Sequence, residues 1–121
     1  MDTQQILRAI AALRAPAMPG EYDLHQMVAG ALRAAGISCE HEYRLAPRRR
    51  IDFFAGGVGV EIKKGRPNAR ELLRQVERYL ECEQINEIIV VTQKDTPLPA
   101  RVAGKPVTTV SLNRLWGVAL P

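Results

Sequence analysis

The sequence predicts an α/β domain in which helices flank a central mixed β-sheet. Apolar residues with helical spacing occupy the first 35 residues and return after residue 67. Between these segments apolar and polar residues alternate, as they do in half-buried strands. The short run Glu87-Ile-Ile-Val-Val-Thr92 is rich in β-branched residues, which is typical of a strand buried on both faces.

The composition fits one folded domain. The chain has 121 residues, of which 46% are hydrophobic and 25% charged, as in ordinary globular proteins. There is no repeat or internal boundary, so residues 1–121 are expected to form a single domain. No apolar run approaches the ~20 residues that a membrane span requires. The N-terminus lacks a signal-peptide pattern, and two distant cysteines predict free thiols, so a cytoplasmic protein without a membrane partner is expected.

Two amphipathic helices are expected first. One covers residues 3–14 and is broken by the segment 16–20, which contains two prolines and a glycine. The other covers residues 21–35. Gly36 is suited to end it, because glycine readily adopts the left-handed conformation found after helices. The apolar stripe of the second helix consists of Leu24, Met27, Val28, Ala31, Leu32 and Ala35.

Three strands are expected next, at residues 37–45, 50–54 and 58–63. Ala55-Gly56-Gly57 joins the last two and predicts a hairpin with a two-residue glycine turn. In that register Asp52 would lie opposite Glu61. Side chains alternate along a strand, so Ile51 and Phe53 are expected on one face of the second strand, with Asp52 on the other. By the same rule Glu61 and Lys63 share a face of the third strand.

The remaining elements alternate between helix and strand. A helix is expected over residues 68–83, because Pro67 and Asn68 suit its start. Its buried face consists of Leu72, Leu73, Val76, Tyr79 and Leu80. A strand at 87–92, a loop at 94–104, a strand near 107–110 and a short helix around 112–116 complete the domain, with Trp116 expected in the core.

The pairing of Asp52 with Glu61 is the strongest indication of function. Their Cβ atoms would be roughly 5 Å apart, where two carboxylates repel. A divalent cation between them converts repulsion into binding, because hard cations such as Mg²⁺ prefer carboxylate oxygens. Lys63 projects from the same face about 6–7 Å further along. Acidic metal ligands beside one cation suit phosphodiester hydrolysis. The plainer interpretation is a surface hairpin in which Lys63 neutralises Glu61.

These residues resemble the PD-(D/E)XK nuclease superfamily, which has a restriction-endonuclease-like fold. Its core motif matches Arg50-Ile-Asp52, eight intervening residues and Glu61-Ile-Lys63. Gln75-Val-Glu-Arg-Tyr79 resembles the Q-x-x-x-Y motif of the RecB-type branch. The expected α-β-β-β-α-β order over residues 21–92 agrees with that family. Ile51 stands where the family name has proline.

The resemblance implies a set of site residues. Asp52 and Glu61 would bind one or two Mg²⁺ or Mn²⁺ ions, with the Ile62 carbonyl as a further ligand. Lys63 would position or activate the attacking water. By the same resemblance Gln75 and Tyr79 would line the site or touch DNA.

The family also carries an acid in the preceding helix, and Glu21 is the best match. The alternative is that Glu21 only favours the positive end of the helix dipole. Glu42 on the first strand is a weaker substitute. His25 lies one turn after Glu21 and is expected to be a surface side chain rather than a ligand.

Basic residues around the third helix indicate a nucleic-acid surface. Their spacing places most of them on one helix face or just before it, and the proposed set is Arg50, Lys64, Arg66, Arg70, Arg74 and Arg78. Phosphate contacts would use such a surface, and the formal net charge is +4. The alternative is a solvated face that pairs with Glu71, Glu77 and Glu81.

The expected function is therefore that of a Mg²⁺-dependent DNA nuclease. The small size favours a structure-selective or weakly sequence-selective endonuclease, or one that gains specificity from a protein partner. A homodimer of the Holliday-junction-resolvase kind and a phage or mobile-element nuclease are two versions. The alternatives are a non-catalytic nucleic-acid-binding module on the same fold and an interaction subunit with a basic surface. The sequence is compatible with DNA or RNA, and with endo- or exonuclease action.

Overall fold

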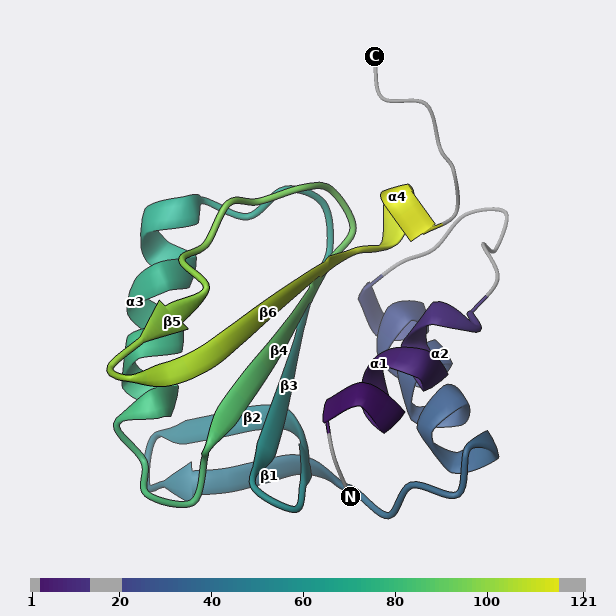
Figure 1. The fold of residues 1–121 in the computed structure, drawn as a ribbon, viewed down its shortest axis with the longest axis horizontal. Coiled ribbons are helices and arrows are strands. Elements are labelled where there is room, and N and C mark those ends of the chain that lie inside the picture. Colours follow the sequence, from purple (N-terminus) through teal and green to yellow (C-terminus); the bar gives the residue numbers. More distant parts are fainter. Residues whose placement is uncertain (1–2, 14–20, 116–121) are drawn as a thin grey trace.

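The computed structural model describes residues 3–13 and 21–115, with the backbone alone for residues 21–23. It is an α/β fold in which helices flank a six-stranded mixed sheet (Figure 1), as predicted. The elements in chain order are α1 (Thr3–Ala11), α2 (Glu21–Ala34), β1 (Glu40–Ala46), β2 (Arg49–Ala55), β3 (Val58–Lys63), α3 (Ala69–Leu80), β4 (Glu87–Thr92), β5 (Arg101–Val102), β6 (Lys105–Ser111) and α4 (Leu112–Leu115).

The sheet has the strand order β1-β2-β3-β4-β6-β5. Strands β1, β2 and β3 pair antiparallel, whereas β3, β4 and β6 are parallel. The parallel strands end at one edge of the sheet, which we call the carboxyl edge. Helix α3 connects β3 to β4 and covers one face of the sheet, while α1 and α2 cover the other (Figure 1).

Each face of the sheet has its own apolar core. Beneath α1 and α2, buried side chains of both helices pack against Phe53, Val60 and Ile62. Beneath α3, its buried face packs against Ile51 and neighbouring side chains. Strand β4 contributes to both cores, Ile89 and Val91 to the first and Ile88 and Val90 to the second. Its continuous apolar run therefore reflects burial on both faces, as predicted.

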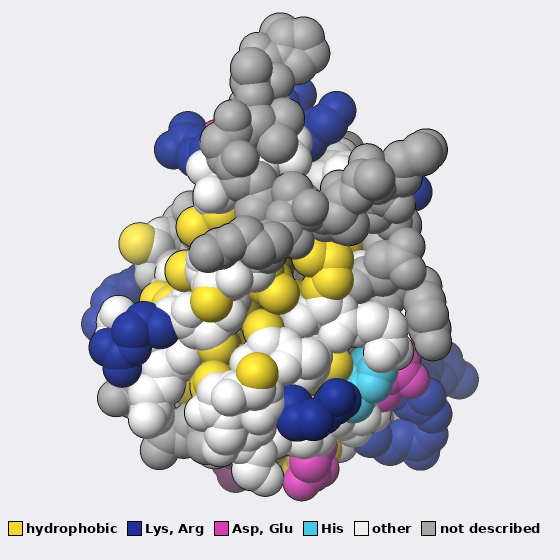
Figure 2. All heavy atoms as spheres, turned by 90° about the vertical axis from the view of Figure 1, so that its right-hand side faces the viewer, with side chains coloured by type: hydrophobic (Ala, Val, Ile, Leu, Met, Phe, Trp, Pro, Cys, Tyr) yellow, Lys and Arg dark blue, Asp and Glu magenta, His cyan; other side chains and the backbone are white. Residues whose placement is uncertain are grey.

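The outer surface of α1 and α2 exposes apolar atoms (Figure 2). A cavity of about 570 Å³ lies between these helices. Most of its lining consists of alanine and other uncharged residues, and Arg8 is its one charged member. Among the described residues, this lining includes no acid that could bind a metal or transfer a proton.

Local sequence signals explain where two of the helices end or begin. Gly36 follows α2 with a φ of 72°, and the Ile37 N–H donates to the Leu32 carbonyl at 2.9 Å, as in a helix-ending Schellman motif. The Asn68 side chain accepts from the Glu71 N–H at 3.1 Å and so caps α3.

Several boundaries differ from the predicted ones. Strand β1 begins at Glu40 rather than at residue 37, because the Ile37 N–H still donates to the last turn of α2. Helix α3 ends at Leu80, before residue 83. Strand β5 lies inside the expected loop 94–104 and was missed, since it is only two residues long. Helix α1 ends at Ala11. The expected helix residue 14, the break at 16–20 and Trp116 lie outside the described residues.

The state of the cysteines is as predicted. Cys39 and Cys82 are free thiols. In the described part of the chain, no helix combines the length and apolar character of a membrane span.

Lys105 of β6 joins the sheet to the end of α3. Its Nζ donates to the carbonyls of Leu80, Cys82 and Ile85 at 2.8, 3.2 and 2.7 Å. Lys105→Met keeps an unbranched stem but removes the ammonium, so we expect the free energy of unfolding in urea to fall by about 2 kcal/mol. The exposed Lys94→Met is the control and should change it by less than about 0.5 kcal/mol. Equal effects would contradict this role of Lys105.

Candidate functional site

The hairpin of β2 and β3 has the predicted register near its turn. Phe53 pairs with Val60, and Ala55 with Val58. Gly56 and Gly57 have φ angles of 54° and 87°, which favour glycine at both positions.

Beyond Phe53, carboxylates replace the backbone pairing between β2 and β3. The Ile62 N–H donates to Oδ2 of Asp52 at 2.7 Å, and the Asp52 N–H donates to Oε1 of Glu61 at 3.2 Å. Each acid therefore bridges the two strands through a hydrogen bond to the backbone of the other strand. The predicted pair is thus brought together, but through these bonds rather than as a continued backbone ladder.

The predicted faces of β2 are wrong at this point. Ile51 packs in the core beneath α3, whereas Phe53 packs in the core beneath α1 and α2. Strict alternation would place both on one face. Asp52 lies between them, so β2 changes face at Asp52.

Strand β1 changes face beside it. His41 stacks on Phe53 with 4.7 Å between ring centroids, and Tyr43 stacks on Phe54 with 4.4 Å. Glu42, between His41 and Tyr43 in the chain, has a φ of 52°, a left-handed conformation that is uncommon for a residue other than glycine. Irregularities of this kind re-aim side chains and are frequent beside active sites.

A cavity of about 380 Å³ opens at this irregularity; we call it the acidic cavity. Lys63 Nζ lies 3.3 Å from Glu61 Oε2, with 27% of the lysine side chain and 5% of the glutamate side chain exposed. The structure therefore brings Asp52, Glu61, Ile62 and Lys63 together. The lining of the acidic cavity is His25, Gln26, His41, Glu42, Asp52, Glu61, Ile62 and Lys63.

Helix α3 holds Glu61 from the other side. Gln75 Nε2 donates to Glu61 Oε2 at 3.1 Å and to the Tyr79 hydroxyl at 3.0 Å. The Tyr79 hydroxyl lies 2.8 Å from the Arg50 carbonyl and 3.2 Å from Glu61 Oε2. Neither Gln75 nor Tyr79 lines the acidic cavity. Both residues therefore orient Glu61 from behind in this structure.

The pKa values of the two acids are raised in the folded protein, in which Glu61 is buried and Asp52 half-buried. Burial, followed by repulsion from Asp52, raises the pKa of Glu61 to about 7. Burial also raises the pKa of Asp52, against the lowering effect of the hydrogen bond from the Ile62 N–H. Burial and the neighbouring Glu61 carboxylate raise the pKa of Tyr79, which stays a neutral donor.

The donor set suits a hard divalent cation. Asp52 and Glu61 offer carboxylate oxygens, which Mg²⁺ prefers. The Ile62 N–H points toward Asp52, and in an extended strand the carbonyl of the same residue points to the same side. Within the described residues, no cluster of three or more His, Cys, Asp and Glu forms a ready metal cage. Water and substrate phosphate would then complete the coordination, as is usual for Mg²⁺.

Two histidines of the acidic cavity were missed by the sequence interpretation. His25 was expected at the surface, but its side chain is 17% exposed and its Nε2 lies 3.6 Å from Asp52 Oδ2. Its position one turn after Glu21 was the available signal. His41 reaches the cavity through the change of face at Glu42, which no sequence feature indicated.

The other predicted residues do not all lie at this cavity. Glu21 begins α2, but its side chain lies outside the described part. Glu42, the weaker substitute, lines the acidic cavity. The predicted basic residues Arg50, Lys64, Arg66, Arg70, Arg74 and Arg78 are all exposed. Among the described residues, Glu81 pairs with Arg49, and no ion pair joins Glu71, Glu77 or Glu81 to the predicted arginines.

Tyr79→Phe tests the support behind Glu61. Loss of the hydroxyl removes the hydrogen bond that Tyr79 donates to the Arg50 carbonyl. We therefore expect the free energy of unfolding to fall by about 1 kcal/mol. The control is Tyr43→Phe. The ring of Tyr43 stacks on Phe54, and loss of its hydroxyl should change the free energy of unfolding little. Urea denaturation measures both, and equal losses would contradict a special role of the Tyr79 hydroxyl.

Comparison with known proteins assigns the chain to no family. No protein-family model, curated protein or solved structure matches the chain. The functional interpretation therefore depends on the side chains of the acidic cavity and their arrangement.

Proposed function

We propose that the protein is a Mg²⁺- or Mn²⁺-dependent nuclease that hydrolyses phosphodiester bonds in DNA. The observation that carries this proposal is the meeting of Asp52, Glu61 and Lys63 in one cavity of about 380 Å³. Glu61 is buried and Asp52 half-buried, and burial together with repulsion between them, which Lys63 offsets only in part, raises the pKa of Glu61. A divalent cation is the partner that best fits their oxygens.

Three groups of this chain would hold the cation: the carboxylates of Asp52 and Glu61 and the carbonyl of Ile62. When bound, such an ion lowers the pKa of water and offsets negative charge on a phosphate. Gln75 keeps Glu61 Oε2 fixed through its 3.1 Å hydrogen bond, so that Oε1 stays at the Asp52 side.

Lys63 would serve the reacting phosphate. Its ammonium is paired with Glu61 at 3.3 Å, is partly exposed and already lines the cavity, so a phosphate in the cavity would lie within its reach. There it would donate to the attacking water or to a phosphate oxygen, where charge develops during hydrolysis. In the plainer interpretation, the pairing of Lys63 with Glu61 serves only to neutralise the glutamate.

The proposal includes a set of partners. DNA phosphates would contact the exposed residues Arg50, Lys64, Arg66, Arg70, Arg74 and Arg78. A homodimer, or a protein partner that supplies specificity, would suit so small an endonuclease. The family resemblance supports DNA as substrate, and the free thiols of Cys39 and Cys82 support a cytoplasmic setting.

A cleavage assay tests the proposal. Linear, nicked, flapped and four-way DNA are incubated with Mg²⁺, Mn²⁺ or EDTA. We expect metal-dependent cutting of at least one substrate by the wild type and by Glu77→Ala, which removes an exposed acid of α3. Asp52→Ala and Lys63→Ala should cut none. Equal cutting by wild type and Asp52→Ala would reveal a contaminant, and DNA binding without cutting would favour the non-catalytic module.

A further inference from the structure

The acidic cavity lies at one end of the carboxyl edge of the sheet, which runs on from β3 to β4 and β6. Lys63 at the end of β3 is level with Thr92 of β4, and Thr92 is level with Ser111 at the end of β6. Lys63 itself lines the acidic cavity. The segments that follow these three strands therefore extend from the candidate site along one edge of the protein.

Backbone hydrogen bonds join the first two of these segments. The Gln93 N–H donates to the Lys63 carbonyl at 3.1 Å, and the Lys94 N–H donates to the Gly65 carbonyl at 3.0 Å. The Gly65 N–H in turn donates to Oε1 of Gln93 at 2.9 Å. These bonds hold Lys94 next to the loop that leads away from Lys63.

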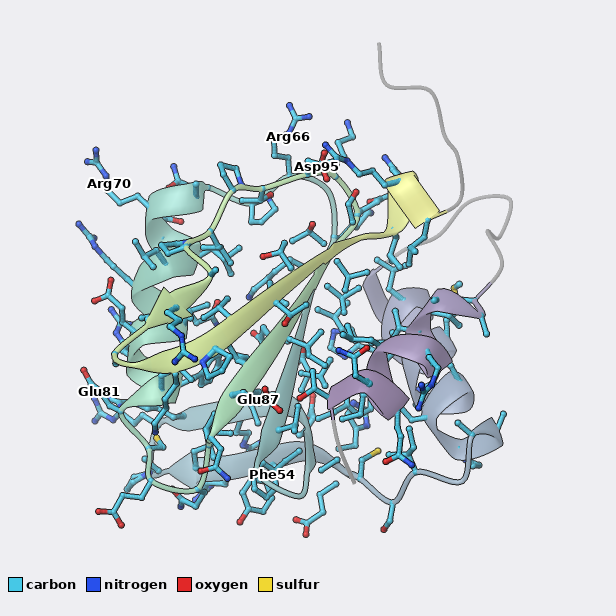
Figure 3. All side chains as sticks on the ribbon, viewed as in Figure 1. Phe54, Arg66, Arg70, Glu81, Glu87 and Asp95 are labelled. Carbon is cyan, nitrogen blue, oxygen red and sulfur yellow. The ribbon has the colours of Figure 1, made fainter. Side chains whose placement is uncertain are left out.

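Asp95 joins the third segment to the others. Arg66 Nε donates to the Asp95 carbonyl at 3.3 Å, and Arg114 Nε of α4 lies 2.6 Å from Asp95 Oδ2. Figure 3 shows Arg66 and Asp95 close together at this edge, with Arg70 extending outward from the start of α3. The three segments thus form one continuous surface.

This surface is strongly basic. Its acids are Glu71 and Asp95, so most of the formal net charge of +4 is concentrated here. The Arg114 side chain is 77% exposed even while paired with Asp95. The exposed cations of this surface, which we call the basic rim, are Lys64, Arg66, Arg70, Lys94 and Arg114.

We infer that the basic rim is the track along which a nucleic-acid backbone extends from the active site, with Lys94 and Arg114 as phosphate contacts. This inference rests on the proposed function and names the surface that holds its substrate. Cations on a hydrogen-bonded framework suit phosphate contacts, because such contacts fix the position of the nucleic acid. Lys94 and Arg114 lie outside residues 21–92, so the nuclease resemblance does not supply them.

Asp95 opposes binding at the rim. Its carboxylate forms an ion pair with Arg114. A phosphate that binds Arg114 must displace this carboxylate or lie close to it. Asp95→Asn removes this charge but keeps the backbone carbonyl that accepts from Arg66. The inference therefore predicts tighter binding by this variant, a gain that damage to the fold would not produce.

The experiment measures binding in EDTA by fluorescence anisotropy, with duplex DNA, single-stranded DNA and RNA of one length at several salt concentrations. For the nucleic acid that wild type binds best, Lys94→Gln/Arg114→Gln should raise Kd about tenfold and reduce the logarithmic salt slope by about 2. Arg8→Gln/Arg101→Gln removes the same charge from α1 and β5. This control should leave both Kd and the salt slope near their wild-type values. Asp95→Asn should lower Kd several-fold.

The outcomes separate this inference from the proposed function. Equal binding by the two double variants, or no binding of any nucleic acid by the wild type, would overturn the basic rim. Cleavage by a protein whose rim variants bind normally would overturn the rim alone. Binding that depends on the rim without metal-dependent cleavage would overturn the nuclease proposal and leave the rim supported.

Discussion

Asp52→Asn is expected to lower the rate of Mg²⁺-dependent DNA cleavage by at least about a thousandfold. Asparagine has nearly the same shape, and its oxygen can still accept the 2.7 Å hydrogen bond from the Ile62 N–H. The substitution therefore preserves the local backbone and removes mainly the charge that attracts a cation. Single-turnover cleavage at saturating protein measures the effect without a contribution from product release.

Unfolding measurements accompany this kinetic test. Removing the half-buried Asp52 carboxylate, which repels the buried Glu61, should leave the metal-free protein at least as stable as wild type. Glu77→Gln, on the exposed side of α3, is the matched control and should keep the wild-type rate. A rate for Asp52→Asn within about tenfold of wild type would contradict a metal ligand at this position.

The metal-free protein is expected to lose stability as the pH rises from 5 to 8. In the folded state the pKa of Glu61 is about 7, against an ordinary value of 4.5, so folded protein binds this proton more tightly than unfolded protein. Stability from the protonated Glu61 is complete below about pH 4.5 and disappears as the pH passes 7. The full effect is up to about 3 kcal/mol, and the raised pKa of Asp52 acts in the same direction.

Glu61→Gln isolates this effect. Groups away from this pair titrate equally in both proteins, so the difference between wild type and variant in urea unfolding reports Glu61 together with the neighbouring Asp52. We expect the variant to match wild type near pH 5 and to be the more stable at pH 8. Saturating Mg²⁺ should raise wild-type stability at pH 8 and not that of the variant. A constant difference across this pH range would contradict a buried, repelled Glu61.

Local signals in the sequence predicted most of the fold because they act over a few residues. Gly36 ended α2 through its left-handed backbone conformation, and Asn68 began α3 through the hydrogen bond that its side chain accepts. The glycine turn set the hairpin register as far as Phe53 and Val60. Strand β5 was missed because two residues carry no periodicity.

The details of the site depend on contacts between segments distant in the chain. Alternation placed Ile51 and Phe53 on one face, yet the hydrogen bonds between Asp52 and β3 replace the regular ladder and let β2 change face. Glu42 gives no sequence signal of its left-handed conformation, although that conformation directs His41 to the acidic cavity. His25 could be placed only once α2 was packed across the sheet.

Binding of Mn²⁺ to the metal-free protein at pH 8, followed by electron paramagnetic resonance, tests most directly whether Asp52 and Glu61 share a cation. The account predicts that wild type depletes the signal of free Mn²⁺ and that Asp52→Asn/Glu61→Gln does not. Glu77→Gln/Glu83→Gln, which removes the same charge from exposed positions, should bind like wild type. Equal Mn²⁺ binding by the two double variants, or none by the wild type, would contradict it.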